Sequence, residues 1–464
     1  MSQNQFGIAM ILRSRLMTEY GMLSVLVLII IAFSLVTIKN QPIEGSYAGK
    51  ELANRVVSQS PNGGNYVLIV TQSGEDQKLK AAFQSGLPNS ITQHLRIVDQ
   101  ASPLHAKQVL HTLTQQPDWK IDLIVCSRTT AAWTFYSHMI SLQSTPIISP
   151  QQEKRSNFLK SRNLQTLPLK MVRMAVIAIG MTMIIITAGI DLSVGSLVGL
   201  SAVTSTLLIK NYGGGTNAGY LMVLLCFAGG IIFCGLMGFT SGILTTFFKV
   251  PAFIATLAMM MIARGLAQNL SHNNIITGMP EVVFENLLNL KIDLGVTSIE
   301  LATPIVLMAV LYLAAHVVMS HTILGRYIYA IGGNREAARL SGVAVGQVLL
   351  IVYTITGLMA GIAGVIMAIE FRSGKGIWGQ TLELDVIAAV VVGGTSLMGG
   401  QGRVLGTLIG CAIIVVIKNG MNLLSLHENT QNIVMGLVIL AAIVIDKIKS
   451  SEIKWENWNT LFPA

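Results

Sequence analysis

Charged residues and cysteines are scarce in this sequence of 464 residues. Only 11% of the residues are charged, against about 25% in an average soluble domain, while 52% are hydrophobic. Cys226, Cys234 and Cys411 lie in apolar runs, which leaves Cys126 alone in a polar region and excludes a disulfide framework. The composition therefore indicates a membrane protein rather than a soluble one.

The usual signatures of nucleotide and metal sites are also missing. No Gly-x-x-x-x-Gly-Lys-Ser/Thr phosphate loop occurs, so the chain cannot supply a Walker-type ATP site. Glycines 399, 400, 402 and 406 cluster between two apolar runs without a preceding soluble strand, and we interpret them as a turn. The histidines of the polar region lack the paired spacing of a zinc site. We therefore expect no catalytic site, no metal and no cofactor bound by this chain.

The basic residues are dispersed, although the net charge is +9. A nucleic-acid surface would gather them in one patch, so we expect no nucleic-acid partner. Instead, they fit the enrichment of Lys and Arg in the cytoplasmic loops of membrane proteins. With the N-terminus in the cytoplasm, Lys249, Arg326 and Arg403 all fall on the inner side. The same assignment places the C-terminus inside and surrounds the apolar runs with membrane lipid.

About ten apolar runs approach the length of roughly 20 residues that a helix needs to cross a bilayer. They predict an all-α polytopic membrane protein. The first run follows Arg13 and Arg15 as in a signal peptide, but it is long and no small-residue cleavage site follows, so we interpret it as an uncleaved helix. The predicted transmembrane helices lie near residues 21–39, 167–188, 191–210, 219–245, 251–270, 301–319, 346–369, 384–398, 403–425 and 430–446.

Residues 40–156 are the exception, because no segment there could span a bilayer. Short apolar runs alternate with helical patterns, which predicts a small α/β insert with a parallel sheet, outside the cytoplasm. The expected strands are 66–71, 95–98, 121–126 and 146–148, and the expected helices are 75–85, 103–115 and 131–140. The chain thus divides into an N-terminus with the first helix (1–39), the insert (40–156), a helical core (157–448) with an inner loop at 320–345, and a cytoplasmic tail (449–464).

The inner loop contains a segment with the features of a short capped helix. Asn334 can cap the first amides, Glu336 lies in the first turn where the helix dipole favours an anion, and Gly342 can end the helix. Ala337 and Ala338 leave one face shallow enough to fit a groove of another protein. Such a helix suits the transmission of a partner's motion into the spans; the alternative is a solvated loop.

Three long stretches carry a family resemblance. They read IAIGMTMIIITAGIDLSVGS at 177–196, GRYIYAIGGNREAARLSG at 325–342 and ELDVIAAVVVGGTSLMGG at 383–400. In this order they resemble the permease subunits of ribose-type ABC importers, closely over 157–448 and loosely over 1–38. The insert is a departure from that family, whose members usually run from the first span almost directly into a segment like 157–164.

The resemblance implies a transport subunit, not an enzyme, that moves a monosaccharide across the bacterial inner membrane, with ribose as the first guess. It implies three partners: an ATPase subunit that holds ATP and Mg, an extracytoplasmic sugar-binding protein, and a second permease copy or relative. The insert would either steady the docked binding protein or be a neutral passenger. The residues expected to couple to the ATPase are Gly325, Arg326, Asn334, Arg335, Glu336, Ala337, Ala338, Arg339 and Gly342.

Polar residues in or near the apolar runs are candidates for a sugar pathway or gate, because uncharged sugars are bound through their hydroxyl groups. Asp191 would either cap the following helix or touch the substrate. The others would bind sugar or form bonds between helices. The candidates are Asp191, Ser193, Gly195, Arg264, Gln268, Thr395, Ser396 and Asn419.

Two other classes of protein remain open. An ion-coupled secondary transporter usually needs carboxylates inside the membrane, whereas the acidic residues here, Asp191 included, fall at predicted span ends. A membrane sensor with the insert as its ligand domain would explain the α/β region but not the other nine spans. Glu383 and Asp385 flank an outer loop, where they would meet a delivering protein or form a solvated rim.

Overall fold

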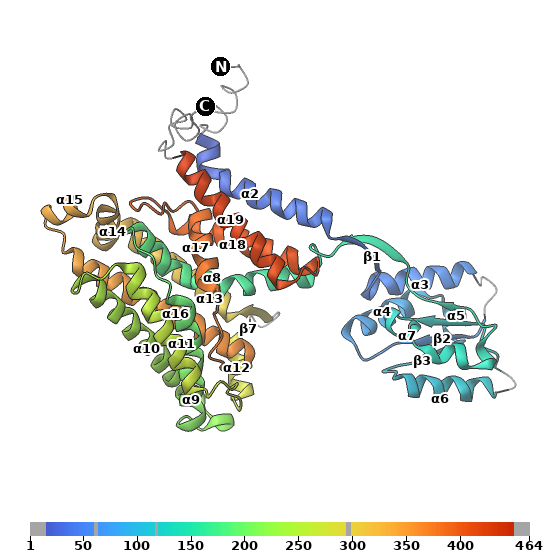
Figure 1. The fold of residues 1–464 in the computed structure, drawn as a ribbon. Helices are drawn as coiled ribbons and strands as arrows, with labels where there is room; N and C mark the ends of the chain where they lie inside the picture. The colour runs from blue at the N-terminus through green and yellow to red at the C-terminus, as the bar shows by residue number, and fades with distance from the viewer. Residues whose placement is uncertain (1–14, 60–63, 117–118, 294–297, 450–464) are drawn as a thin grey trace, which may run out of the picture. The chain divides into compact units, whose positions relative to one another are not determined.

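The structure is a computed structural model that describes residues 15–59, 64–116, 119–293 and 298–449 (Figure 1). The described residues fall into two compact units, one within Met1–Thr37 and Phe158–Ala464 and the other within Ile38–Asn157. We call them the helical unit and the insert. The beginning of the predicted cytoplasmic N-terminus and all of the predicted tail after residue 449 lie outside the described residues.

In the described part of the helical unit, seven helices are long and apolar enough to cross a membrane. They are α8 (Ser161–Ile186), α9 (Val194–Asn211), α10 (Tyr220–Thr246), α11 (Ala252–Leu270), α13 (Thr303–His321), α16 (Val345–Phe371) and α18 (Val404–Leu423). Two further helices, α2 (Arg15–Val36) and α19 (Glu428–Lys449), contain shorter apolar stretches within the described side chains. The predicted all-α polytopic membrane fold is confirmed.

One predicted span is wrong in length. In place of a helix over 384–398, α17 covers only Leu382–Val392, about 16 Å at 1.5 Å per residue and half of a hydrocarbon core. The helix ends at Gly393, because Gly394 adopts a φ of 85° that a right-handed helix cannot contain. Residues 372–381 before it are not helical, and we call them the 372–381 segment. The gap expected between the spans 346–369 and 384–398 is present, whereas the end of α17 at Gly393 lies in an apolar run that hydropathy does not divide.

Short elements lie at the two ends of the bundle. One end carries α14 (Ile323–Gly333) and α15 (Arg335–Leu340), and we call it the α15 end. The other end carries α12 (Glu281–Leu288) and the hairpin of β7 (Asn289–Asp293) and β8 (Ser298–Ala302), and we call it the α12 end. A 3-10 turn, η3 (Gly215–Asn217), connects α9 to α10.

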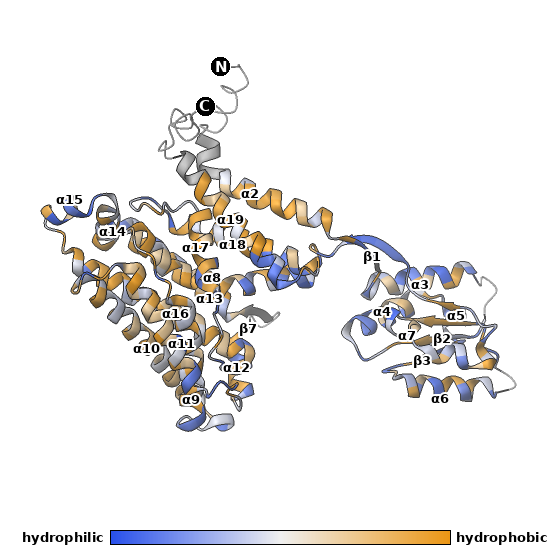
Figure 2. Cartoon of the chain, in the orientation of Figure 1, coloured by the Kyte–Doolittle hydropathy of each residue, from blue (hydrophilic) through white to orange (hydrophobic). Residues whose placement is uncertain are grey.

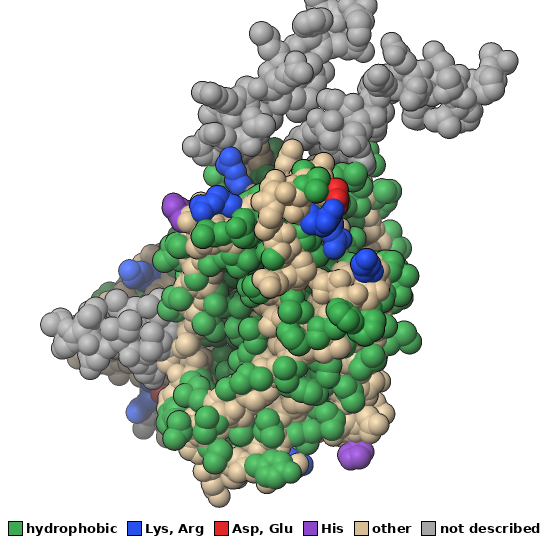
Figure 3. Space-filling view, turned by 90° about the vertical axis from the view of Figure 1, so that its left-hand side faces the viewer, with side chains coloured by type: hydrophobic (Ala, Val, Ile, Leu, Met, Phe, Trp, Pro, Cys, Tyr) green, Lys and Arg blue, Asp and Glu red, His purple; other side chains and the backbone are tan. Residues whose placement is uncertain are grey.

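The helices differ in how far they are covered by the rest of the unit. In the most apolar stretch of α8, 78% of the residues are buried, against 28% in α11 and in α13. Figure 2 shows that the helices are largely hydrophobic, and Figure 3 shows a broad hydrophobic face with Lys and Arg side chains gathered toward one end. A bilayer favours a large apolar surface bounded by charge, and this face has that composition. The buried fractions place α8 at the centre of the unit and α11 and α13 at its periphery.

The insert is built on a parallel sheet with strand order β3-β2-β4-β5. The strands are Tyr66–Ile69 (β2), Leu95–Val98 (β3), Leu123–Cys126 (β4) and Ile147–Ile148 (β5), and Tyr66 pairs with both Leu95 and Leu123. Helices α3 (Gly45–Gln59) and α4 (Gly74–Gly86) pack on one face, whereas α6 (Pro103–Thr114) packs on the other. The predicted parallel α/β insert is therefore correct.

Two details of the insert differ from the prediction. The helix expected over 131–140 is replaced by α7 (Arg128–Ala131) and two 3-10 turns, Thr134–His138 and Ile140–Leu142. Helix α3 was not predicted, since its buried positions are mostly small residues rather than a strong apolar stripe. A further short helix, α5, covers Asn89–Thr92.

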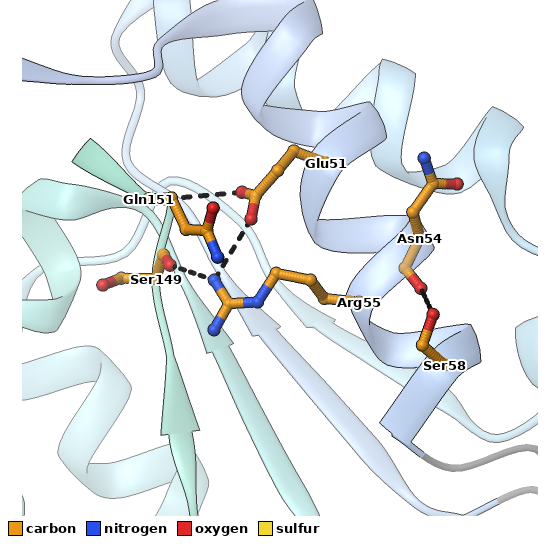
Figure 4. A network of polar contacts seen from close by, with 6 residues as sticks. All are labelled: Glu51, Asn54, Arg55, Ser58, Ser149 and Gln151. Carbon is orange, nitrogen blue, oxygen red and sulfur yellow. Dashed lines mark hydrogen bonds and ion pairs between the residues drawn. The ribbon is translucent and has the colours of Figure 1, made fainter. Parts of the chain in front are cut away.

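A two-stranded ribbon carries the chain into and out of the insert. Strand β1 (Ile38–Pro42) pairs antiparallel with β6 (Gln152–Ser156). Figure 4 shows how α3 is tied to the chain before β6: Arg55 Nη1 donates to the Ser149 carbonyl at 2.8 Å, and Glu51 Oε2 accepts from the Gln151 amide at 3.4 Å. These bonds close the α/β layer onto its ribbon.

Candidate functional site

Helix α15 has the capped structure that its sequence predicts. Asn334 Oδ1 accepts a hydrogen bond from the Ala337 amide at 2.9 Å. Arg339 Nε donates to Glu336 Oε2 at 3.0 Å, and this hydrogen bond lowers the pKa of the Glu336 carboxyl. Gly342 ends the helix with a φ of 84°, and its amide donates to the Arg339 carbonyl at 3.0 Å.

The surface of α15 differs from the expected pair of alanines. Ala337 is exposed, but Ala338 is only 5% exposed and packs into the core of the helical unit. Leu340, which the sequence reasoning missed, is 75% exposed and lies beside the charged pair of Glu336 and Arg339. The helix therefore presents the apolar side chains of Ala337 and Leu340 among charges, which is a composition suited to protein contact.

Helix α14 joins α15 to the rest of the bundle through close backbone contacts. A Cβ at Gly332 would overlap the carbonyl of Ile186, the last residue of α8. The Gly400 amide donates to the same carbonyl at 2.8 Å, and Tyr329 Oη donates to the Gly402 carbonyl at 2.8 Å. Gly399, Gly400 and Gly402 thus form a turn, as predicted, which meets α14 and the end of α8 in one place. Gly406 was expected in the same turn but lies in the first turn of α18.

The other two coupling candidates lie in α14. Gly325 approaches α13 so closely that a Cβ there would overlap the Met319 carbonyl. Its amide donates to Thr322 Oγ1 at 3.3 Å, which caps α14. Arg326 is exposed, as is Arg335 in α15. The coupling candidates therefore combine exposed side chains with residues that fix α14 against α13.

The predicted role of Asp191 as the helix cap is wrong. Ser193 is the residue before α9, and Asp191 Oδ1 accepts from the Ser193 amide at 2.7 Å and from Ser193 Oγ at 2.6 Å. The chain takes a local turn around the carboxylate instead of presenting it to the second or third helical amide. Asp191 is fully buried, and its Oδ2 has no hydrogen-bond partner among the described residues.

Three of the candidates come together at the 372–381 segment. Arg264 Nη1 donates to the Trp378 carbonyl at 2.9 Å and to the Gly376 carbonyl at 3.3 Å. Gly376 packs against the backbone of Ala267 and Gln268. A Cβ at Gly195 would overlap both the Gly379 carbonyl and the Glu383 carboxylate. Arg264, Gln268 and Gly195 therefore surround a stretch of non-helical backbone.

The 372–381 segment follows α9 for several turns. Gly374 packs against Ala202 and Thr206, and Gly379 packs against Gly195. Thr206 lies eleven positions after Gly195 in α9, or about 16 Å at 1.5 Å per residue. The segment thus runs deep into the bundle, and α17 begins there.

Consequently, the expectation of a solvated rim at Glu383 and Asp385 is wrong. Glu383 is 9% exposed and Asp385 is 8% exposed. Asp385 forms an ion pair with Lys418 of α18, whereas Glu383 Oε2 has no hydrogen-bond partner in the described part of the chain. The dense run of glycines just before α17 is the sequence signal that could have indicated that Glu383 and Asp385 are buried.

The remaining candidates lie apart from this group. Asn419 of α18 accepts from Lys170 Nζ at 2.8 Å and donates to Asn163 Oδ1 at 2.9 Å, so it links α18 to α8. Thr395 and Ser396 lie in the turn between α17 and α18, at the α15 end, where Thr395 is 1% exposed. The candidate pathway residues therefore form separate groups rather than one site.

A cavity of about 650 Å³ opens at the α12 end. Arg372, which directly follows α16, lies on its wall and approaches Glu281 at 3.8 Å and Glu285 at 4.0 Å. The other lining residues come from the connections before α10 and α12 and from the first turn of α12. The cavity wall carries one basic side chain, Arg372, and one acidic side chain, Glu281.

Comparison with known proteins decides the family. Residues 164–443 match the family described as branched-chain amino acid transport system / permease component. The chain belongs to this permease family. The match begins within α8 and ends within α19, so the insert lies outside it.

Several relatives of the chain are named for sugars. The chain is 40% identical over 295 residues to the ribose import permease protein RbsC of Escherichia coli (strain K12), which covers 63% of this chain and 88% of that protein. It is 38% identical to RbsC of Bacillus subtilis (strain 168), over 64% and 88% of the two chains. It is 32% identical to the D-allose transport system permease protein AlsC of Escherichia coli (strain K12), over 63% and 86%. No solved structure matches the chain.

Proposed function

We propose that this chain is the permease subunit of an ATP-driven importer that moves a monosaccharide, ribose first, across the bacterial inner membrane. The observation that carries the proposal is the 40% identity over 88% of a ribose import permease. Seven helices of the described residues that are long and apolar enough to cross a membrane agree with it, as does the exposed helix α15. ATP and Mg belong to a separate ATPase subunit.

The ATPase subunit docks at the α15 end, which faces the cytoplasm together with both termini. Support comes from the exposed Leu340 beside the pair of Glu336 and Arg339. Because α14 touches both α8 and the 399–402 turn, movement of α15 is passed to α17 and α18. Closure of the ATPase on ATP then switches the side of the membrane from which the sugar pathway is open.

A second permease copy or relative completes the pathway, and an extracytoplasmic sugar-binding protein delivers the sugar at the α12 end. The cavity beside Arg372 and Glu281 is the docking candidate on that side, because its wall carries both charges. Arg264, Gln268 and Gly195 are the pathway candidates, since they surround the 372–381 segment. Asp191, Ser193, Thr395 and Ser396 belong to the gate toward the cytoplasm, and Asn419 fixes α18 against α8.

The insert has two possible roles within this function. Either it steadies the docked binding protein, or it is a passenger without effect on transport. The insert has hydrophobic cores of its own, separate from the core of the helical unit. Both roles are compatible with this separation, because the packing of the helical unit does not use the residues of the insert. Uptake at limiting sugar by a chain without the insert distinguishes the two roles.

The function is tested in proteoliposomes that contain the chain with its ATPase and binding-protein partners. The proposal expects uptake of labelled ribose only when ATP is present on the ATPase side, and little effect of ionophores. A panel of labelled monosaccharides identifies the sugar. Uptake that needs a proton or sodium gradient and no ATP would overturn the proposal and indicate an ion-coupled transporter. Specific ligand binding without any transport would indicate a sensor.

A further inference from the structure

Two carboxylates in the first turn of α17 have opposite surroundings. Asp385 is paired with Lys418, which neutralises it. Glu383 is equally buried, at 9% exposure, yet its Oε2 has no hydrogen-bond partner in the described part of the chain. The nearby Arg264 donates to the carbonyls of Gly376 and Trp378 instead. One oxygen of the Glu383 carboxylate is therefore held inside the bundle without a donor.

Such an oxygen is costly, because burial removes its water and no donor replaces the lost hydrogen bonds. Buried groups without partners are rare in folded proteins, so each one requires an explanation. Inside a membrane bundle, ionisable groups commonly mark a substrate path. Non-helical backbone at this depth is likewise tolerated where it is enclosed by protein or borders a path. Glu383 is such an ionisable group, and the 372–381 segment directly before its helix is such non-helical backbone.

We propose that Glu383 is the carboxylate that accepts hydrogen bonds from the hydroxyl groups of the transported sugar. The inference rests on the proposed function and adds to it a contact residue that determines substrate preference. In the conformation described here, the carboxylate lies against the backbone of Gly195, where no side chain intervenes. This is the closed position, and sugar contact requires the first turn of α17 to move away from α9.

The position of α17 explains how that movement is driven. The helix has only 11 residues, so it moves as one rigid piece. Its far end leads into the turn where Gly400 bonds the last carbonyl of α8 and where Gly332 of α14 fits against the same carbonyl. A displacement of α14 by the ATPase is thereby passed along α17 to Glu383.

The test compares Glu383→Gln and Glu383→Asp with the intact chain, in vesicles with the ATPase and binding-protein partners. Uptake of labelled D-ribose and of labelled 2-deoxy-D-ribose is measured together with ATP hydrolysis. Loss of a hydrogen bond to a charged acceptor lowers binding about tenfold or more. We expect Glu383→Gln to reduce ribose uptake about tenfold, to narrow the difference between the two sugars, and to leave ATP hydrolysis within about twofold. Glu383→Asp keeps the charge and should recover part of the preference.

Two results would overturn the inference while leaving the importer itself intact. One is unchanged uptake and unchanged sugar preference in Glu383→Gln. The other is a parallel loss of uptake and ATP hydrolysis with the preference unchanged, which would make Glu383 a structural residue. Absence of ATP-dependent uptake by the intact chain would instead be a failure of the proposed function, so the two failures are distinct.

Discussion

The Glu383 carboxylate occupies the place that a side chain on Gly195 would fill. The Gly379 carbonyl approaches the same point of α9. The Glu383 carboxylate of α17 and the Gly379 carbonyl of the 372–381 segment can therefore both lie there only because Gly195 has no side chain. Glycine is required here for close approach rather than for an unusual backbone angle. The first turn of α17 is thus positioned by the smallest residue of α9.

Replacing Gly195 by alanine is expected to push the first turn of α17 away from α9. Overpacking of this kind costs about 1–3 kcal/mol and would lower the melting temperature of the purified protein. Uptake should fall by about tenfold or more, because the sugar contact and the gate are both displaced. Gly436→Ala in α19 is the matched control, since nothing lies within 4 Å of a Cβ there. Equal melting temperatures and equal uptake for both variants would contradict the packing described here.

The ion pair of Asp385 and Lys418 makes a second prediction. Removal of one partner leaves a mostly buried charge without compensation. Lys418 stays 31% exposed, so the expected loss is about 1–3 kcal/mol rather than the larger value for a fully buried pair. Asp385→Asn and Lys418→Gln should each lower the melting temperature, and the double variant should be more stable than the sum of the two losses predicts. Strict additivity would show that the pair does not interact.

Much of this architecture could be predicted from the sequence, because it depends on patterns that recur along the chain. Apolar runs place the long helices, and alternating strand and helix patterns predict the parallel sheet of the insert. Local capping was also predictable: Asn334, Glu336 and Gly342 are adjacent in sequence and perform the expected roles in α15. These features require only neighbours along the chain.

Features that depend on contacts between distant residues were not predictable. The gap between the spans 346–369 and 384–398 was predicted, but its contacts with Gly195 of α9 and Arg264 of α11 were not, because an apolar profile cannot show them. For the same reason, Glu383 and Asp385 were expected at a solvated rim, although the structure buries them. Asp191 was expected either to cap α9 or to touch the substrate, and the first of these is wrong because the chain turns around its carboxylate.

The insert offers an independent measure of its own folding through Cys126. This thiol is fully buried, and burial raises its pKa to about 11. It should therefore react very slowly with a maleimide at neutral pH until the insert unfolds. Leu110→Ala removes a fully buried side chain from the same cluster and should cost about 2–5 kcal/mol, which accelerates the labelling of Cys126. Rapid labelling of the unchanged chain, mapped by mass spectrometry, would contradict the buried position.

The ribbon allows the insert to be removed cleanly. Because Pro42 pairs with Gln152, replacing residues 43–151 by Asn-Gly would join β1 and β6 in a two-residue hairpin. The helical unit has its own core, so the shortened chain should insert into membranes and melt at a similar temperature. Failure to insert, with the other variants inserting normally, would show that the two units depend on each other.

Helix α15 allows the importer mechanism to be tested directly. Glu336 and Arg339 are exposed and bond each other, so exchanging both charges preserves an opposite-charge pair within the helix. If an ATPase binds this surface through these charges, the double exchange should not restore the transport that each single change abolishes. If the pair only stabilises α15, the exchange should restore transport, because the intrahelical ion pair is kept.

The most direct measurement is therefore ATP-dependent uptake of labelled ribose by the intact chain, by Glu336→Lys, by Arg339→Glu and by the double exchange. All four are compared with the same ATPase and binding-protein partners and at equal amounts of inserted protein. We predict uptake by the intact chain that needs ATP and that all three variants abolish. Uptake that proceeds without ATP, follows an ion gradient and is indifferent to the three changes would contradict both the importer function and the role of α15.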